Sequence, residues 1–197
     1  VIITQETSLM HLATVYKHDS FLPVDTVEIF ERSDYNFAGR PPNLISFVYE
    51  MSGVENVLNI INLHMKCCED GVSRRHQASI MLHDYLTLNM SRGDSNFVVV
   101  GDWNDDIYDP DESGLYSFEA FLEDPDNFTF ITDSLAARHQ TSTATFPTWN
   151  SFLDNILISS SLFDEFSGST VETLRLELVV DDYSRYISDH RPVLWSF

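Results

Sequence analysis

Basic residues are scarce in this chain of 197 residues, in which 11 Lys and Arg stand against 31 Asp and Glu and give a formal net charge of −20 at pH 7. Such a surface repels phosphate backbones at long range, which excludes strong non-specific nucleic-acid binding through a basic patch. A metal ion could still bind a phosphodiester locally, because the charge of the ion dominates its surroundings. The acidity suits a salty or extracellular setting, which favours a secreted or periplasmic location without fixing the compartment.

Cysteine is also scarce, since Cys67 and Cys68 are the only two in the chain. Neighbouring residues seldom pair with each other, because disulfide geometry is demanding. The sequence therefore contains no disulfide framework and no zinc-binding spacing. We expect one of these thiols to be buried in the core and the other to be free, which leaves the redox compartment undecided.

Long apolar runs are also missing, and none approaches the roughly 18 residues that a membrane-spanning helix needs. We therefore expect no membrane span. The chain opens at "VIITQE" without Met or a charged leader, so it looks trimmed and an export signal would be invisible in it. The 43% hydrophobic content is enough for a substantial core, and the length fits one domain over residues 1–197, which we expect to be monomeric.

Short β-branched and aromatic runs recur along the chain, with turn residues between them. We predict strands at 1–4, 12–17, 26–31, 44–50, 57–65, 96–102, 153–159 and 177–180. Apolar positions in residues 73–90 roughly follow a 3.6-residue period, which predicts a helix capped by Ser73. A second helix is predicted near 115–123 and a shorter turn at 160–166. Fully apolar runs such as "FVVV" predict strands buried on both faces, and hence a single α/β domain with layers on each side of a sheet.

Polar and ionisable groups lie where the predicted buried strands end. They are His64 after "VLNIINL", Asp102 and Asn104 after "FVVV", Asp154 within "FLDNILIS", and Asp189 and His190 before "RPVLW". Loops at the edge of a rigid sheet often carry catalytic groups. Taken singly, most of these residues have a plain structural explanation, such as a turn or a satisfied histidine. Asp154 is different, because an unpaired buried carboxylate is costly; it needs a partner, and a histidine is the natural one.

The stretch "VVVGDWNDD" crowds four acidic or amide side chains behind three valines: Asp102, Asn104, Asp105 and Asp106. Either a turn or a divalent-cation site would explain this crowding. Asp102 and Asn104 are one residue apart, so both should project to the same side of an extended chain, with Trp103 turned toward a packing layer. Asp105 and Asp106 are interpreted as ordinary loop residues, although Asp105 could support the site indirectly.

Four ordered segments together resemble the endonuclease/exonuclease/phosphatase superfamily, whose fold is deoxyribonuclease I-like: "NLHMK" (62–66), "VVVGDWND" (98–105), "SFLDNILIS" (151–159) and "SDHRPV" (188–193). Their order, spacing and strand context agree over residues 44–197. The opening "VIITQE" resembles the family strand that ends in Gln-Glu. The resemblance implies an α/β (α+β) four-layer sandwich, with two packed, mainly antiparallel β-sheets flanked by helices. It also implies that the sequence lacks the family's first strand, and that a loop is missing after Glu6.

The same resemblance implies a divalent-metal site. Glu6 would be the principal metal ligand, and Asp189 would be a second ligand or would orient the water at the metal. Mg²⁺ or Mn²⁺ is the implied ion, with Ca²⁺ as a further candidate. A hard divalent ion on carboxylate and amide oxygens can neutralise the charge that phosphodiester hydrolysis places on the phosphoryl oxygens.

The remaining family positions would act on the substrate. Asp102 would align or deprotonate the attacking water, and Asn104 would hold a phosphate oxygen. Asp154 would fix the tautomer of His190 and favour its protonated form, so that His190 contacts the scissile phosphate. His64 would stabilise the phosphorane-like oxygens or protonate the leaving group.

The implied activity is hydrolysis of phosphodiester bonds, with an endonuclease or exonuclease acting on nucleic acid as the first interpretation. A phosphatase or a lipid or inositol phosphodiesterase of the same fold is an alternative, and so is a non-catalytic binding domain. Retention of the polar residues at buried strand ends argues against the non-catalytic form. Arg74 and Arg75 at a helix start indicate an anionic ligand or a carboxylate partner. Trp149 is interpreted either as a substrate-side residue or as a buried one.

Overall fold

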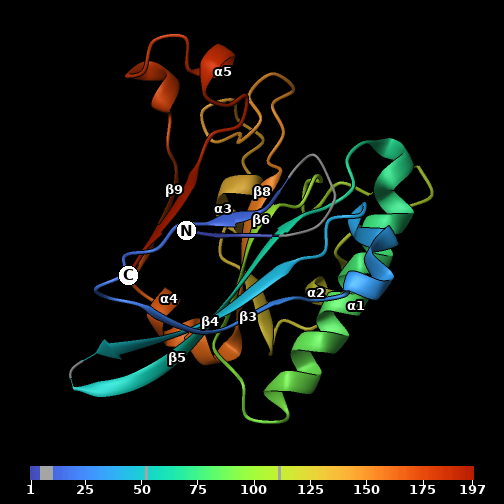
Figure 1. Ribbon diagram of the computed structural model, residues 1–197. Helices are drawn as coiled ribbons and strands as arrows, with labels where there is room; N and C mark the ends of the chain where they lie inside the picture. The colour runs from blue at the N-terminus through green and yellow to red at the C-terminus, as the bar shows by residue number, and fades with distance from the viewer. Residues whose placement is uncertain (5–10, 52, 111) are drawn as a thin grey trace.

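The computed structural model describes residues 1–4, 11–51, 53–110 and 112–197 (Figure 1). In chain order, with η marking 3₁₀ helices, its elements are β1 (Ile2–Ile3), β2 (Ala13–Thr14), β3 (Leu22–Glu28), η1 (Glu31–Phe37), β4 (Asn43–Met51), β5 (Val54–His64), η2 (Glu69–Gly71), α1 (Val72–Met90), β6 (Phe97–Asp102), α2 (Glu119–Leu122), β7 (Phe128–Phe130), α3 (Asp133–Ala136), β8 (Asp154–Ser159), η3 (Ser160–Leu162), α4 (Phe163–Phe166), β9 (Thr170–Thr173), η4 (Leu176–Leu178), α5 (Tyr183–Tyr186) and β10 (Val193–Ser196).

A six-stranded sheet in the order β3-β4-β5-β6-β8-β7 forms the centre of the molecule. Its strands pair antiparallel except β5 and β6, which are parallel and joined through α1. Because successive side chains of a strand point to opposite faces, β6 contributes to two cores. Phe97 and Val99 pack in the same core as Leu82 of α1, whereas Val98 packs with Ile158 on the other face.

Two short strand pairs cover the face of the central sheet opposite α1. Trp195 of the β9–β10 pair packs against the core formed by Val98 and Ile158. Asn62, on the same side of β5 as Ile60, donates a hydrogen bond of 3.1 Å to a carbonyl of β2. The described part of the chain therefore stacks helices, a mainly antiparallel sheet and a second β layer, which confirms the expected α/β sandwich.

Several predicted elements differ from the observed ones. The helix expected over 73–90 is confirmed as α1, but it starts at Val72 and no side chain caps it. The helix expected at 115–123 is reduced to α2. The strand predicted at 177–180 is wrong, because this run is η4 followed by exposed chain, with Val179 79% exposed. β7, β9 and β10 have no predicted counterpart, since they are only three or four residues long.

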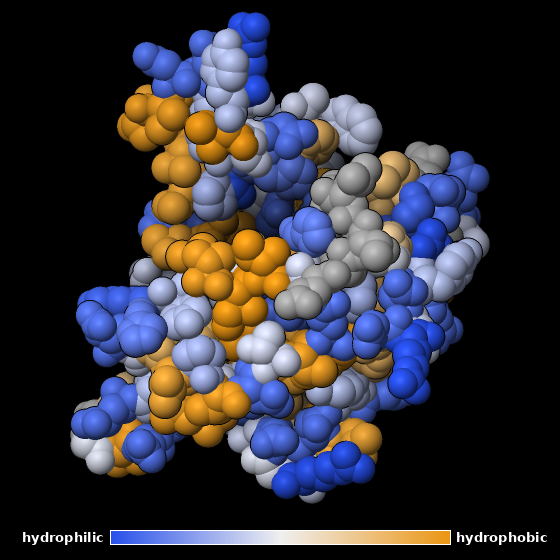
Figure 2. Space-filling view, in the orientation of Figure 1, coloured by the Kyte–Doolittle hydropathy of each residue, from blue (hydrophilic) through white to orange (hydrophobic). Residues whose placement is uncertain are grey.

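The chain between β9 and β10 forms an arm that carries η4 and α5 and projects from the sandwich (Figure 1). Apolar side chains gather on this arm in Figure 2, and the exposed ones include Leu178, Val179 and Ile187. None of the helices in the described ranges is long and apolar enough to cross a bilayer. The chain of this arm also includes His190, one of the predicted site residues.

Candidate functional site

Three strand ends meet at one edge of the central sheet. β5 and β6 run parallel, so their last residues, His64 and Asp102, are register partners. β8 runs antiparallel to β6 and begins at Asp154, which pairs with Asp102. Strand pairing therefore places three of the predicted site residues in one row across the sheet, and no flexible loop is needed to bring them together.

One Asp–His contact lies within this row, and a second joins the row to the loop before β10. Nε2 of His64 lies 3.3 Å from Oδ2 of Asp102. Nδ1 of His190 lies 2.7 Å from Oδ2 of Asp154, which is the partnership that a carboxylate in an apolar strand requires. One ligand atom each from Asp102, Asp154 and His190 lies within 4.8 Å of the others. These side chains are half-buried, so they are shielded from solvent yet still reachable by a ligand.

Buried neighbours fix the position of His190. The guanidinium of Arg191 donates to two loop carbonyls at 2.6 and 3.0 Å and to the Glu177 carboxylate at 2.6 Å. The backbone N–H of Arg191 donates to the carbonyl of Thr145 at 2.7 Å. The Phe146 ring packs on the imidazole with a centroid separation of 4.9 Å. Both the backbone and the ring of His190 are thus held before any substrate arrives.

Electrostatics separates the two histidines of the site. The hydrogen bond that the ring of His190 donates to the Asp154 carboxylate is the main reason that the pKa of His190 is raised, so this ring favours the protonated form. Burial, followed by repulsion from the Arg40 guanidinium, lowers the pKa of His64 to about 4. Burial also raises the pKa of Asp102 to about 6, and the Asp154 charge adds to that rise. At neutral pH the site therefore contains a neutral His64, whose contact with Asp102 is not an ion pair.

Asn104 lies in a turn and not in extended chain. Its φ is 55°, and its backbone N–H donates to Oδ1 of Asp102 at 2.9 Å, as in an Asx-turn. The prediction of an extended chain from Asp102 to Asn104 is wrong. Trp103, which lies between these two residues, is fully buried as expected. The Asn104 side chain still reaches the site edge, because its Nδ2 donates to the carbonyl of Met65, directly after His64, at 3.0 Å. The polar residues that follow the three valines of β6 therefore form a turn, and this turn also borders the candidate site.

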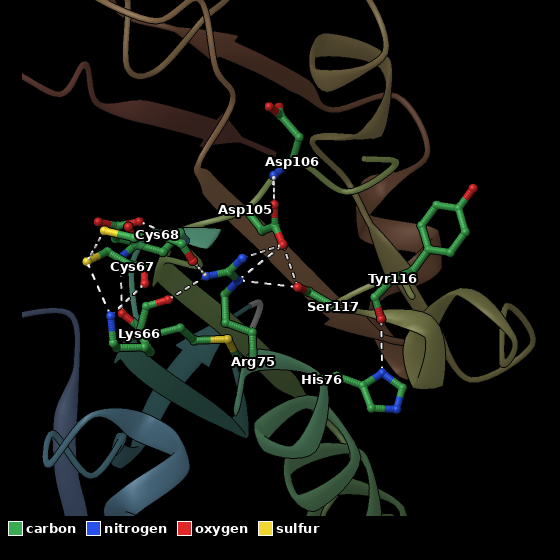
Figure 3. A network of polar contacts seen from close by, with 12 residues as sticks. Lys66, Cys67, Cys68, Arg75, His76, Asp105, Asp106, Tyr116 and Ser117 are labelled. Carbon is green, nitrogen blue, oxygen red and sulfur yellow. Dashed lines mark hydrogen bonds and ion pairs between the residues drawn. The ribbon is translucent and has the colours of Figure 1, made fainter. Parts of the chain in front are cut away.

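Arg75 of α1 ties together the loops that follow β5 and β6 (Figure 3). Its side chain is almost fully buried and donates to the carbonyls of Lys66 and Cys68 at 2.7 and 2.9 Å. The same guanidinium lies 2.9 Å from the Asp105 carboxylate, which Ser117 also contacts. Of the two partners expected for this arginine, the structure therefore shows the carboxylate. Asp105 thereby anchors the loop after β6.

Glu6 and Asp189 are the two predicted metal ligands. Glu6 lies outside the described residues. Asp189 is exposed and is absent from the group of close ligand atoms, although its charge helps to raise the pKa of His190. Their roles stay predictions. Arg40 and Arg191 are buried beside the site, and sequence reasoning missed both because a buried arginine carries no distinguishing pattern.

The cluster has the donor chemistry of a divalent-metal site. Asp102 and Asp154 face each other across β6 and β8, and their mutual repulsion contributes to the raised pKa of Asp102. A cation would relieve this repulsion, and carboxylate oxygens suit a hard divalent ion. These two carboxylates would hold such an ion, which would supply neutralisation of phosphoryl charge.

The sequence by itself matches no protein-family model and no curated protein. Solved structures do match. The human Nocturnin catalytic domain with bound sulfate anion is 17% identical with a TM-score of 0.53, over 90% of this chain and 61% of that one. TDP2 of D. rerio complexed with single strand DNA product is 16% identical with a TM-score of 0.57, over 89% and 68%. The Bacteroides thetaiotaomicron mannosyl-6-phosphatase is 18% identical with a TM-score of 0.53, over 92% and 69%.

These structures are members of the endonuclease/exonuclease/phosphatase superfamily, which is the family that the four sequence segments resemble. This chain spans about three fifths of the Nocturnin domain, since it covers 61% of that length. At identities this low, similarity of structure shows the fold and leaves the substrate open. Strand order, layer arrangement and structural similarity agree, and the chain has the deoxyribonuclease I-like fold of the endonuclease/exonuclease/phosphatase superfamily.

Proposed function

We propose that the protein is a phosphoesterase that uses Mg²⁺ or Mn²⁺ to hydrolyse phosphodiester bonds, with nucleic acid as its substrate. The observation that carries this proposal is the convergence of His64, Asp102, Asp154 and His190 at one sheet edge. These residues come from four separate segments of the chain. Two Asp–His contacts side by side at this sheet edge bring together the acids and bases that phosphodiester hydrolysis needs.

Hydrolysis of a phosphodiester must neutralise phosphoryl charge, activate water and protonate the leaving oxygen. His190, held by Asp154, donates a hydrogen bond to a phosphoryl oxygen and places positive charge beside it. Asp102 accepts a hydrogen bond from the attacking water and orients it toward the phosphorus. The pKa of His64, lowered to about 4, keeps this ring neutral, so it stabilises phosphoryl oxygens through its N–H instead of storing a proton.

An exposed aromatic group beside the site supports nucleic acid as the substrate. Trp149 is 77% exposed, so the buried interpretation of this residue is wrong. Its ring packs on Phe146 at a centroid separation of 5.6 Å, and Phe146 packs on His190. Nucleobases stack on exposed aromatic rings without needing a basic surface for the whole strand. A base next to the scissile phosphate could therefore stack on Trp149.

Replacement of Trp149 by Ala should raise KM for a short single-stranded oligonucleotide about tenfold, because stacking of one base contributes about 1–3 kcal/mol. Turnover of a small chromogenic phosphodiester should be unchanged, since that substrate has no base to stack. Steady-state kinetics on both substrates measures the difference. Tyr35→Ala, which removes another exposed aromatic ring from η1, is the matched control and should affect neither substrate. Equal losses on both substrates in Trp149→Ala would assign the indole a structural role.

A lipid phosphodiesterase is the second candidate, and the exposed arm favours it. Leu178, Val179 and Ile187 expose apolar side chains on the segment that leads into His190. Exposed apolar patches mark contacts with proteins, ligands or membranes. An apolar segment in the same stretch of chain as His190 would suit a phosphoesterase whose substrate headgroup is presented at a lipid surface.

A substrate panel tests the proposed function. Plasmid DNA, RNA, a chromogenic phosphodiester, a phosphomonoester and sphingomyelin vesicles are each incubated with Mg²⁺, with Mn²⁺ and with chelator. Nucleic acid and the chromogenic phosphodiester should be hydrolysed, and chelator should abolish both activities. Hydrolysis of sphingomyelin alone would establish the second candidate. Calorimetric binding of Mg²⁺ without turnover of any substrate would refute both candidates and identify a binding domain.

A further inference from the structure

The loop after β5 exposes the two cysteines of the chain. The expectation that one thiol is buried is wrong, because Cys67 and Cys68 both lie outside the sheet, between the end of β5 and η2. Their sulfur atoms are 2.7 Å apart (Figure 3). Two adjacent, solvent-accessible thiols in contact with each other form a chemical group that the proposed phosphoesterase reaction does not use.

The backbone of this loop places the two thiols on the same side. Neighbouring side chains of an extended chain point in opposite directions, but Cys68 has a φ of 73°, which turns the chain. Arg75 holds the carbonyls of Lys66 and Cys68 on either side of Cys67. Gly71 permits this arrangement, since a Cβ at its position would lie 2.7 Å from Nη1 of Arg75. The thiol pair is therefore preorganised by buried contacts.

The surroundings make the two sulfur atoms unequal. The Cys68 thiol donates to the sulfur of Cys67, and this hydrogen bond is the main reason that the pKa of Cys68 is raised. Nζ of Lys66 lies 3.9 Å from the sulfur of Cys67. Cys67 therefore lies between the thiol of Cys68 and the ammonium of Lys66, which also pairs with Asp70 at 3.1 Å, whereas Cys68 is the donor of the pair. Cys67 is thus the attacking sulfur, and Cys68 is the second thiol that can resolve an adduct.

We propose that Cys67 and Cys68 are a paired-thiol modification site, at which a disulfide reagent is reduced and a Cys67–Cys68 disulfide is formed. The Cys67 thiolate attacks one sulfur of the reagent, which breaks the reagent S–S bond and releases the first thiol. The Cys68 sulfur then attacks the Cys67 sulfur of this mixed disulfide and releases the second thiol. Both protons of the protein thiols end on the released thiols, and two electrons pass from the protein to the reagent.

The Cys67–Cys68 disulfide should be easily reduced. Adjacent Cα atoms are about 3.8 Å apart, whereas disulfide-linked Cα atoms usually lie roughly 4.4–6.8 Å apart. Closure therefore strains the loop, and strained disulfides are the labile ones. A mild dithiol should return the protein to its reduced form.

The test uses the native protein with one molar equivalent of dithiodipyridine, followed by thiopyridone absorbance and intact mass. Because the chain contains only two cysteines, the stoichiometry is unambiguous. We expect two thiopyridones released per protein, a mass lower by two hydrogens, no pyridyl adduct, and full reversal by dithiothreitol. Cys67→Ser and Cys68→Ser should each release one thiopyridone and keep one pyridyl adduct. The Cys68→Ser variant should react faster, because it retains the attacking thiol.

Three results would overturn the proposal. A stable pyridyl adduct on the native protein would show that the two thiols react independently. Covalent dimers on a non-reducing gel would show that the pair closes between molecules. Absence of thiopyridone release would show that the thiols are inaccessible. None of these three readouts measures phosphoesterase activity. The paired-thiol proposal is therefore tested independently of the substrate panel.

Discussion

His190→Ala should lower kcat for a phosphodiester substrate roughly 10³-fold, within the usual contribution of a positioned acid–base group. The imidazole is prepared for its role by the 2.7 Å contact with Asp154, by the packing of Phe146 and by the anchoring of Arg191. Asp154→Ala should lower kcat to a similar extent, because the imidazole then loses its orientation and the group that raises its pKa.

Steady-state kinetics measures both losses, and thermal unfolding should show that each variant keeps its fold, since both side chains are only half-buried. The chain offers a matched control. Nε2 of His83 lies 2.9 Å from Oδ2 of Asp124, so these two residues form another Asp–His pair. His83 lies on α1 and is not one of the residues at the candidate site. His83→Ala should retain full activity. Undiminished activity in either His190→Ala or Asp154→Ala would remove this pair from the proposed mechanism.

Gly101→Ala should destabilise the protein by about 3 kcal/mol or more, from overpacking and an unfavourable backbone conformation together. Gly101 precedes Asp102 in β6 with a φ of 138°, and an added Cβ would lie 2.0 Å from the carbonyl oxygen of Leu63. Leu63 is its register partner in β5, so the clash can be relieved only by separating the two parallel strands. Urea unfolding measures the change in stability.

Gly93→Ala is the control for the backbone conformation alone. Gly93 also has a positive φ, of 106°, but nothing lies within 4 Å of its missing Cβ. This variant should therefore lose only about 1 kcal/mol from the strained conformation. Similar losses in the two variants would mean that the β5–β6 approach is looser than the structure shows. Because Gly101 adjoins the site, its alanine variant should also lose activity before it unfolds completely.

The polar ends of β5 and β6 could be predicted from the sequence. In β6 the apolar run of residues 97–100 is uninterrupted and Asp102 marks its end, whereas in β5 the apolar positions that precede His64 are interrupted by Asn59 and Asn62. Asp154 was predictable for a related reason, since a carboxylate next to the apolar run of β8 needs a partner. The fold class followed from the resemblance carried by these same strand-end segments.

Other parts of the site depend on tertiary contacts that sequence patterns do not express. The burial of Arg75 and its bonds to two loops depend on where α1 docks on the sheet. The left-handed conformation of Asn104 is set by its turn, so period-two reasoning about an extended chain failed there. The arm around α5 was missed because its apolar residues stay exposed, and hydrophobicity alone predicted a buried strand.

The wide separation of the site residues along the chain has a consequence for refolding. Asp154 and His190 are 36 positions apart, and the row also requires β5 and β6 to pair across the intervening α1. Non-local pairings form slowly, because the entropy of closing long loops must be overcome before the contacts stabilise them. Circular dichroism should therefore recover ahead of enzymatic turnover after dilution from denaturant, and the docking of the last segment, with His190, should set the lag.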